Sequence, residues 1–325
     1  MRYSVLTQVE RRRRPRRRRP AFLLVLAAAL GAGAYFGVQH FRAHPEQAAA
    51  APKPASQPPR ERFTARPTRV ALLSTPRAPR HGTPSVTARS AILVDASSGA
   101  VLWQKRPHRR RPIASTTKIM TAALVLERLR LDQVVTVAPG VPRTPLVREG
   151  LRAHERVPVW KLLDGLLIFS GNDDALALAV AAAGSRPRFL ALMNGKAQEL
   201  GLHDTHFASV SGVIDENNYS SAWDLAALTR YATRDPRFRK VVATRIARVP
   251  WAAPTYGKVY VNKNALLGTY RGADGVKTGW TTVAGHCLVA SAHRKGVRLI
   301  AVLLHSADPY GDARRLLNFG FALPR

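Results

Sequence analysis

The segment "PIASTTKIMTA", Pro112 to Ala122, places a serine and a lysine three residues apart in a stretch that otherwise has the apolar pattern of a core helix. On a helix, positions i and i+3 share a face, so the hydroxyl of Ser115 and the amine of Lys118 are expected within hydrogen-bonding distance. A serine hydroxyl becomes a good nucleophile when a neighbouring base takes its proton, and desolvation among apolar side chains can hold a lysine neutral. The segment therefore predicts a nucleophile and its base. A chain of 325 residues is also expected to contain about one Ser-x-x-Lys by chance, so further parts of a site are needed.

Two more polar islands interrupt apolar stretches. Ser170-Gly171-Asn172 breaks a strongly helical pattern, either as a helix–helix turn or as part of a site. Lys277-Thr278-Gly279 lies in what we expect to be an inner strand, where a lysine is costly unless it faces a cleft and an anion. The alternative for the lysine is a charge on an edge strand.

The composition excludes some classes of protein. A net charge of +31 is compatible with a polyanionic partner, but the basic residues are scattered and no nucleic-acid-binding motif is present, so we expect no nucleic acid. The single cysteine, Cys287, rules out an internal disulfide and stands in an apolar run typical of a buried thiol.

The first 38 residues have the pattern of a membrane anchor. "RRRRPRRRRP" (11–20) precedes the uncharged run 21–38, whose length of about 27 Å as a helix suffices to cross a bilayer core. We interpret 1–20 as a basic cytoplasmic segment and 21–38 as a transmembrane anchor with everything after it exported. A cleaved signal sequence, with Ala32-Gly33-Ala34 as its site, and a nucleic-acid-binding arm beside a core helix are the alternatives.

The rest of the chain divides into a linker and one domain. Residues 39–85 are rich in Pro, Ala and Arg and predict an extended tether, and residues 86–325 predict a globular domain. Residues 90–105 have a strand–turn–strand pattern, and three further strands precede a closing helix near the C-terminus. We therefore expect an α+β fold, with an antiparallel sheet formed by both ends of the domain around a helical subdomain.

Ser-x-x-Lys, Ser-x-Asn and Lys-Thr-Gly each occur once, in this order, and their combination resembles the signature of penicillin-binding proteins and β-lactamases. "ASTTKIMTA", "SGNDDALALA" and "GADGVKTGWTTVAGHCLVASA" are similar to serine D-alanyl-D-alanine carboxypeptidases, the low-molecular-mass penicillin-binding proteins, and the likeness runs from about Ala91 to Phe321. It implies a penicillin-binding/β-lactamase-like transpeptidase fold. The implied substrates are peptidoglycan stem peptides ending in D-Ala-D-Ala, cleaved through an acyl-enzyme without a cofactor. β-Lactams are then covalent inhibitors.

The resemblance also implies roles on the helical side of the site. Ser115 would be the nucleophile and Lys118 its base. Ser170 would relay a proton to the departing D-alanine, and Asn172 would bind the peptide amide of the substrate.

On the strand side, Lys277 and Thr278 would hold the terminal carboxylate of the substrate. Gly279 would let the strand backbone approach the substrate closely. The backbone N–H groups of Ser115 and Trp280 would form the oxyanion hole.

Several features qualify this resemblance. Larger relatives carry a second domain and a C-terminal amphipathic helix, so we expect the N-terminal segment to take over anchoring here. No Glu-x-x-Leu-Asn segment is present, which predicts slow β-lactam hydrolysis. His203 and His206 have the spacing of a metal pair but lack a nearby third ligand, so no metal site is expected. An endopeptidase that cuts cross-links would carry the same three motifs and is the first alternative. A non-catalytic protein of this fold that binds the cell wall is a second alternative, although the intact motifs argue against it.

Overall fold

The structure of the protein, a computed structural model, describes residues 72–73, 83–213, 217–251 and 256–324. The basic segment 1–20, the apolar segment 21–38 and most of the linker expected at 39–85 lie outside the described residues. Leu73, within the range expected as linker, forms a parallel bridge to Ala100. The boundary expected at residue 86 stays a prediction.

The described residues form short turns and regular elements in the following order. The strands and helices are β1 (Ser90–Asp95), β2 (Val101–Lys105), β3 (Arg111–Pro112), α2 (Lys118–Arg128), β4 (Val134–Thr136), β5 (Arg156–Pro158), α3 (Val159–Asp164), α4 (Asn172–Ala183), α5 (Arg186–Glu199), β6 (Tyr219–Ser220), α6 (Ala222–Ala232), α7 (Pro236–Ala243), β7 (Ile246–Val249), β8 (Lys258–Val261), β9 (Ala273–Thr281), β10 (Gly285–Arg294), β11 (Val297–Ser306) and α8 (Pro309–Ala322). Three short helical segments are η1 (Ala114–Thr117), η2 (Val141–Arg143) and the π-helical η3 (Gly165–Phe169).

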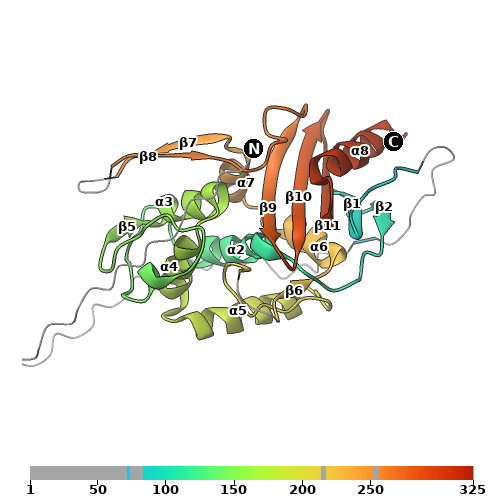
Figure 1. Ribbon diagram of the computed structural model, residues 1–325. Coiled ribbons are helices and arrows are strands. Elements are labelled where there is room, and N and C mark those ends of the chain that lie inside the picture. The colour runs from blue at the N-terminus through green and yellow to red at the C-terminus, as the bar shows by residue number, and fades with distance from the viewer. Residues whose placement is uncertain (1–71, 74–82, 214–216, 252–255, 325) are drawn as a thin grey trace, which may run out of the picture. The chain divides into compact units, whose positions relative to one another are not determined.

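Both ends of the domain build one five-stranded antiparallel sheet in the order β2-β1-β11-β10-β9 (Figure 1). β1 and β2 form the expected hairpin, and β1 then pairs with β11, with Leu93 opposite Ala301. The prediction of an α+β fold whose sheet is shared by both ends of the domain is confirmed. The expectation that Lys277 lies in an inner strand is wrong, because β9 is an edge strand of this sheet.

The two faces of the sheet bury different cores, as the period of two in β-strands requires. Leu93, Ala290 and Ala301 point toward α8, where they pack with Leu316. Their neighbours, such as Ile92, belong to the larger core under α2, α4, α5 and α6. In Figure 1 α2, α3, α4 and α5 lie to the left of the sheet and below it, α7 lies beside the edge strand β9, and α6 lies behind the strands.

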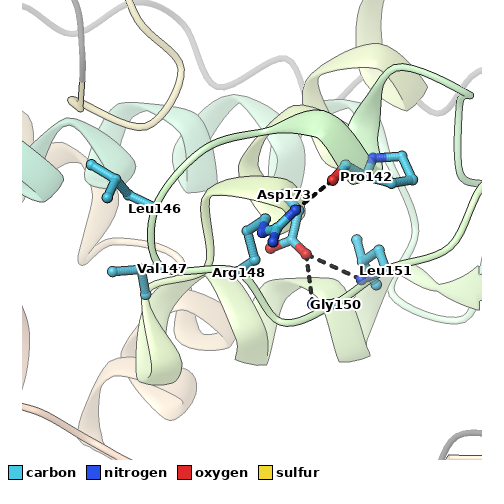
Figure 2. Close-up of a pocket in the computed structure, with 7 residues that line it drawn as sticks. All are labelled: Pro142, Leu146, Val147, Arg148, Gly150, Leu151 and Asp173. Atoms are coloured by element: carbon cyan, nitrogen blue, oxygen red, sulfur yellow. Dashed lines mark hydrogen bonds between the residues drawn. The ribbon is translucent and has the colours of Figure 1, made fainter. Parts of the chain in front are cut away.

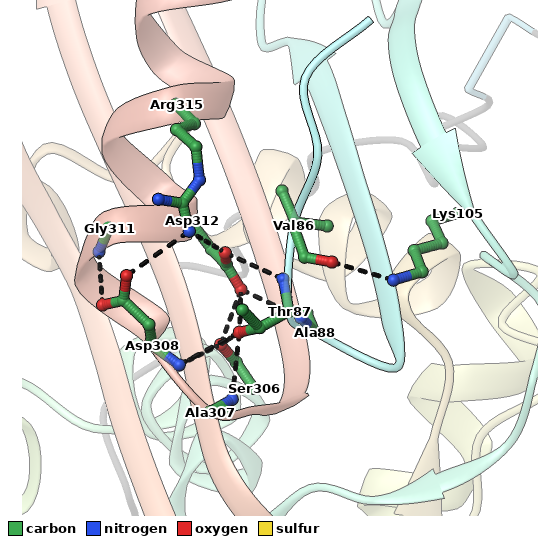
Figure 3. Close-up of polar contacts among 10 residues, drawn as sticks. All are labelled: Val86, Thr87, Ala88, Lys105, Ser306, Ala307, Asp308, Gly311, Asp312 and Arg315. Carbon is green, nitrogen blue, oxygen red and sulfur yellow. Dashed lines mark hydrogen bonds and ion pairs between the residues drawn. The ribbon is translucent and has the colours of Figure 1, made fainter.

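A buried carboxylate joins the two ends of the domain (Figure 3). Asp312, in the first turn of α8, accepts hydrogen bonds from the backbone N–H of Thr87 and Ala88 at 2.9 Å each and from the Ser306 hydroxyl at 2.7 Å. Because a buried charge is stable only when it is paired or hydrogen-bonded, this network keeps the start of β1 beside the end of β11.

Within the described ranges, no single helix has both the length and the apolar character needed to cross a membrane. By length and composition alone, α4 and α5 meet that test only as a pair bent by 85°.

Candidate active site

Ser115 and Lys118, the predicted nucleophile and its base, meet at the start of α2. Ser115 lies in the 3₁₀ turn η1, and α2 begins at Lys118. In a 3₁₀ turn, side chains three residues apart lie one above the other. Lys118 Nζ accordingly donates a hydrogen bond to Ser115 Oγ at 3.0 Å, so the predicted contact is present.

Three acceptors of the described residues surround the amine of Lys118. Its side chain has no exposed surface, and its Nζ also donates to Asn172 Oδ1 at 2.7 Å and to the Ser211 carbonyl at 3.1 Å. Burial, followed by the nearby charge of Lys277, lowers the pKa of Lys118 well below its usual value. A neutral amine beside a serine hydroxyl can accept the hydroxyl proton.

The predicted break at Ser170-Gly171-Asn172 forms the opposite wall of the site. Ser170 ends the π-helical segment with a left-handed backbone (φ +74°), and α4 begins at Asn172. A Cβ at Gly171 would lie 1.9 Å from Asp174 Oδ2, so a side chain there would displace the buried carboxyl of Asp174. This strained and tightly packed turn is costly for an element that only connects two helices.

A loop before β5 orients Asn172. The Nδ2 of Asn172 donates to the carbonyls of Pro145 at 3.2 Å and Leu146 at 3.0 Å, and its backbone N–H donates to Val147 at 2.9 Å. Since Oδ1 of the same side chain accepts from Lys118, Asn172 links this loop to the lysine. Its role toward a substrate amide stays a prediction.

Figure 2 shows how Asp173 fixes the same loop. Its carboxylate accepts from the backbone N–H of Glu149 at 2.9 Å, Gly150 at 2.8 Å and Leu151 at 3.1 Å. Leu146 and Val147 lie apart from this anchor in Figure 2 and are 63% and 43% exposed. They help to line an adjoining cavity of about 580 Å³.

The edge strand β9 brings a second buried lysine to the site. Lys277 is 2% exposed, and its Nζ donates to Ser170 Oγ at 3.0 Å and to the Thr278 carbonyl at 3.1 Å. Burial, followed by the charge of Lys263, lowers the pKa of Lys277 to about 7. The lysine thus turns toward the Ser170 wall rather than to solvent, although its strand is at the edge of the sheet.

Gly279 sets the distance between β9 and the nucleophile. A Cβ at this position would lie 2.8 Å from the backbone nitrogen of Ser115 and 3.0 Å from Ala114 Cβ. A side chain would therefore displace the turn that carries Ser115. Gly279 thus allows β9 to pack closely against the turn that carries Ser115. Its expected role, close approach of the strand to the substrate, stays a prediction.

The remaining strand-side residues lie beside this contact. Thr278 is half-buried, and Trp280 is 60% exposed with its ring centroid 6.3 Å from that of His286. The structure thus joins Ser115 and Asn172 through Lys118, joins Ser170 to Lys277 in a second hydrogen-bonded pair, and places Gly279 against the turn that carries Ser115. The carboxylate-binding and oxyanion roles of Thr278 and Trp280 stay predictions.

A segment whose residues received no predicted role covers the nucleophile turn. The Ser211 carbonyl accepts from Lys118, and a Cβ on Gly212 (φ +78°) would lie 1.8 Å from the Ala114 carbonyl oxygen. Asn218 Nδ2 donates to Thr117 Oγ1 at 2.8 Å. The available signal was the dense run of Ser, Gly and Asn in "SGVIDENNYSSAW".

Cys287 and His206 take no part in the hydrogen bonds described above. Cys287 is a free, buried thiol, and burial raises its pKa to about 11, as expected of a structural cysteine. His206 packs its ring against Tyr219, and no group of three or more potential metal ligands occurs among the residues that the structure describes.

Comparison with known proteins identifies the family to which the sequence is similar. The profile of the family described as D-alanyl-D-alanine carboxypeptidase matches residues 77–308. The chain is 34% identical to D-alanyl-D-alanine carboxypeptidase DacF of Bacillus subtilis, over 72% of this chain and 62% of that protein. It is 36% identical to the D-alanyl-D-alanine carboxypeptidase of a Streptomyces species, over 74% of this chain and 89% of that protein.

Solved structures agree with these sequence matches. A Streptomyces DD-transpeptidase superposes with a TM-score of 0.71 at 34% identity, over 75% of this chain and 100% of that one. A D-alanyl-D-alanine carboxypeptidase from Mycobacterium tuberculosis superposes with a TM-score of 0.72 at 31% identity, over 77% of this chain and 97% of that one. The chain spans about two thirds of the length of several longer relatives, and nearly all of these two structures.

Proposed function

The chain belongs to the D-alanyl-D-alanine carboxypeptidase family, and we propose that it is a serine-type hydrolase that removes the terminal D-alanine of peptidoglycan stem peptides. The observation that carries this proposal is the 3.0 Å contact between Ser115 Oγ and a fully buried lysine amine. A lysine with a lowered pKa can act as a general base at neutral pH, and a serine beside it can act as a nucleophile.

Acylation would begin at the contact between Ser115 and Lys118. Lys118 takes the proton of Ser115 as Oγ attacks the carbonyl of the penultimate D-alanine. The backbone N–H groups of Ser115 and Trp280 receive the charge on the carbonyl oxygen. The C–N bond breaks, and the departing nitrogen takes a proton that returns from Lys118 through Ser170, which leaves an ester on Ser115. Water hydrolyses this ester in the second half of the reaction.

The two acceptors besides Ser115 assist the base. When Lys118 becomes an ammonium, Asn172 Oδ1 and the Ser211 carbonyl already stand at 2.7 and 3.1 Å to stabilise its charge. This preorganisation lowers the barrier because no group has to move during the proton transfer.

Lys277 supports recognition of the substrate's terminal carboxylate. Two of its three N–H groups have acceptors among the described residues, which leaves one donor for an anion beside Ser170. The Thr278 hydroxyl would provide a second donor. A β-lactam with a carboxylate would bind in the same way and acylate Ser115. Its leaving group remains tethered to the acyl group, which slows deacylation.

The same proposal includes a place in the cell. Residues 21–38 would anchor the chain in the cytoplasmic membrane with residues 1–20 inside, and the linker 39–85 would carry the domain on the outer side, where peptidoglycan lies. If the apolar segment is cleaved as a signal, the domain would be secreted. The arginine block beside an uncharged run supports this proposal.

The test measures products and covalent labelling together. Full-length protein in detergent should release D-alanine from a defined pentapeptide and should bind one fluorescent penicillin per chain on Ser115. Ser115→Ala should abolish both signals, whereas Ser97→Ala, an exposed turn serine, should retain them. A cross-linked dimer tested in parallel would reveal endopeptidase activity if it is cleaved faster than the pentapeptide. Penicillin attached to another residue would contradict the proposal.

A further inference from the structure

Two carboxylic side chains share a closed space behind the Ser170-Gly171-Asn172 turn. Glu149 comes from the loop before β5 and Asp174 from the first turn of α4, and their side chains are 1% and 0% exposed. The Cβ that Gly165 lacks would lie 2.5 Å from both Glu149 Oε2 and Asp174 Oδ1. These two oxygens are therefore within about 5 Å of each other.

The hydrogen bonds around the pair leave three oxygens without a donor. Glu149 Oε1 accepts from Lys258 Nζ at 3.1 Å and from the Tyr260 hydroxyl. Glu149 Oε2 and both oxygens of Asp174 have no partner among the described residues. Buried carboxylate oxygens are costly without donors, and one proton held between the two groups would satisfy two of them.

The charge balance also requires that proton. Other charged groups of the surrounding elements interact with the pair, namely Lys118 of α2, Asp164 of α3, Asp173 of α4 and Lys258 of β8, whereas Lys240 of α7 interacts with Asp164. Asp173 is held by three backbone N–H groups, and Lys258 alone forms an ion pair with Glu149. Burial, then the hydrogen bond to Glu149 and the charges of Glu149 and Asp173, raise the pKa of Asp174 well above its usual value.

We propose that Glu149 and Asp174 share one proton and act as positioning residues that keep Asn172 and Lys118 ready for acylation. The shared proton joins the loop that carries Glu149 to the first turn of α4. That loop supplies the carbonyls of Pro145 and Leu146 that hold the Asn172 side chain, and Asn172 in turn accepts from Lys118. The proposal rests on the function proposed above, because it concerns the base of that reaction.

Loss of the proton would act by two routes. Two adjacent negative charges with one lysine partner would push the loop away from α4 and loosen Asn172. In addition, an ionised Asp174 raises the pKa of Lys118, which favours the ammonium form that cannot accept the serine proton. Both routes reduce acylation at alkaline pH.

The experiment follows the rate at which a β-lactam ester acylates full-length protein in detergent between pH 5 and 10. An ester is used because it lacks the carboxylate that Lys277 would bind, so titration of Lys277 contributes little. Asp174→Asn keeps a donor to Glu149 but cannot ionise, and it should move the alkaline limb of the profile upward by at least one pH unit. Glu149→Gln should move it in the same direction and serves if Asp174→Asn does not fold. Profiles that superpose on the wild type would overturn the proposal.

A matched control and a second measurement separate this proposal from the function itself. Asp224→Asn replaces another buried carboxyl, on α6, and should leave the profile unchanged. Infrared difference spectra of wild type minus Asp174→Asn at neutral pH should show the carbonyl stretch of a protonated carboxyl. This band does not depend on activity, so it would survive a failure of the proposed function. Its absence in folded protein would show that the pair holds no proton.

Discussion

Helix α2 and the edge strand β9 each contribute one buried lysine to the site, and the two lysines differ in how completely the protein surrounds their amines. Lys118 and Lys277 are 0% and 2% exposed, and each donates to a serine hydroxyl at 3.0 Å. Lys118 has three acceptors, one for each N–H of an ammonium. Lys277 has two, so one of its donors remains for a ligand.

The difference teaches that burial alone does not define the role of a lysine. The closed set of acceptors around Lys118 suits a proton that moves within the protein, and this lysine is active when it is neutral. The incomplete set around Lys277 suits an external anion, and this lysine is active when it is charged. A pKa of about 7 for Lys277 leaves both forms populated at neutral pH until an anion favours the ammonium.

Removal of the base should have the largest effect. Lys118→Ala should slow acylation by about 10²- to 10⁴-fold, the usual contribution of a general base, whether or not the β-lactam carries a free carboxylate. Second-order rate constants for a penicillin and its ester would measure this. Lys196→Met, which removes a lysine paired on α5, should stay near the wild-type rate. A loss confined to the free acid would erase the distinction between the two lysines.

Removal of the anion-binding lysine should have a smaller and selective effect. Lys277→Ala should slow acylation by free-acid substrates by about 10- to 150-fold, because a charge-assisted hydrogen bond is worth about 1.5 to 3 kcal/mol. The ester should react at nearly the same rate with both proteins, apart from a small change that arises because the charge of Lys277 helps to lower the pKa of Lys118. An equal loss on both substrates would place Lys277 in the activation machinery or the fold.

The pH dependence of the same pair of substrates checks the sign of this effect. Lys277 binds a carboxylate as an ammonium, so in wild-type protein the affinity for free acids should fall by about tenfold per pH unit above about 7. The decline should end at the pKa of Lys277 in the complex, which the bound anion raises. Lys277→Ala should remove this dependence.

The sequence carried the parts of the site that lie close together along the chain. The spacing of Ser115 and Lys118 predicted their contact, and the break at Ser170-Gly171-Asn172 predicted the end of one helix and the start of the next. The sheet was also predictable, because strands with buried faces have a clear period, and two such runs lie at the start of the domain and three near its end.

Contacts between distant segments were not predictable in this way. The mixed apolar and polar sequence of β9 suits an inner or an edge strand, so only the pairing of strands shows that Lys277 lies at an edge. The Ser211 carbonyl reaches Lys118 through a backbone atom, and backbone acceptors leave no residue-type signal. Asp174 resembles an ordinary acidic residue in the first turn of a helix until the fold brings Glu149 to it.

The smallest expected effect comes from a lysine that touches neither serine. Lys263 is exposed, with its amine 5.5 Å from the centroid of the Phe169 ring. Its charge contributes to the lowered pKa of Lys277 and, as a lesser cause, to that of Lys118. Lys263→Met should therefore raise both pKa values, and that of Lys277 more. In the pH profile of acylation by a free-acid substrate, the alkaline limb reports Lys277 and the acid limb reports Lys118. The alkaline limb should therefore move to higher pH by more than the acid limb does.

We expect changes in rate of about fivefold or less at any one pH, because an exposed charge that acts without contact is worth about 1 kcal/mol or less. Lys263→Arg keeps the charge and should leave both limbs in place. If the arginine variant moves them as far as the methionine variant does, packing against Phe169 rather than charge is responsible. If the methionine variant moves the acid limb more than the alkaline limb, Lys263 acts mainly on Lys118. The expectation that its charge lowers the pKa of Lys277 more than that of Lys118 would then be wrong.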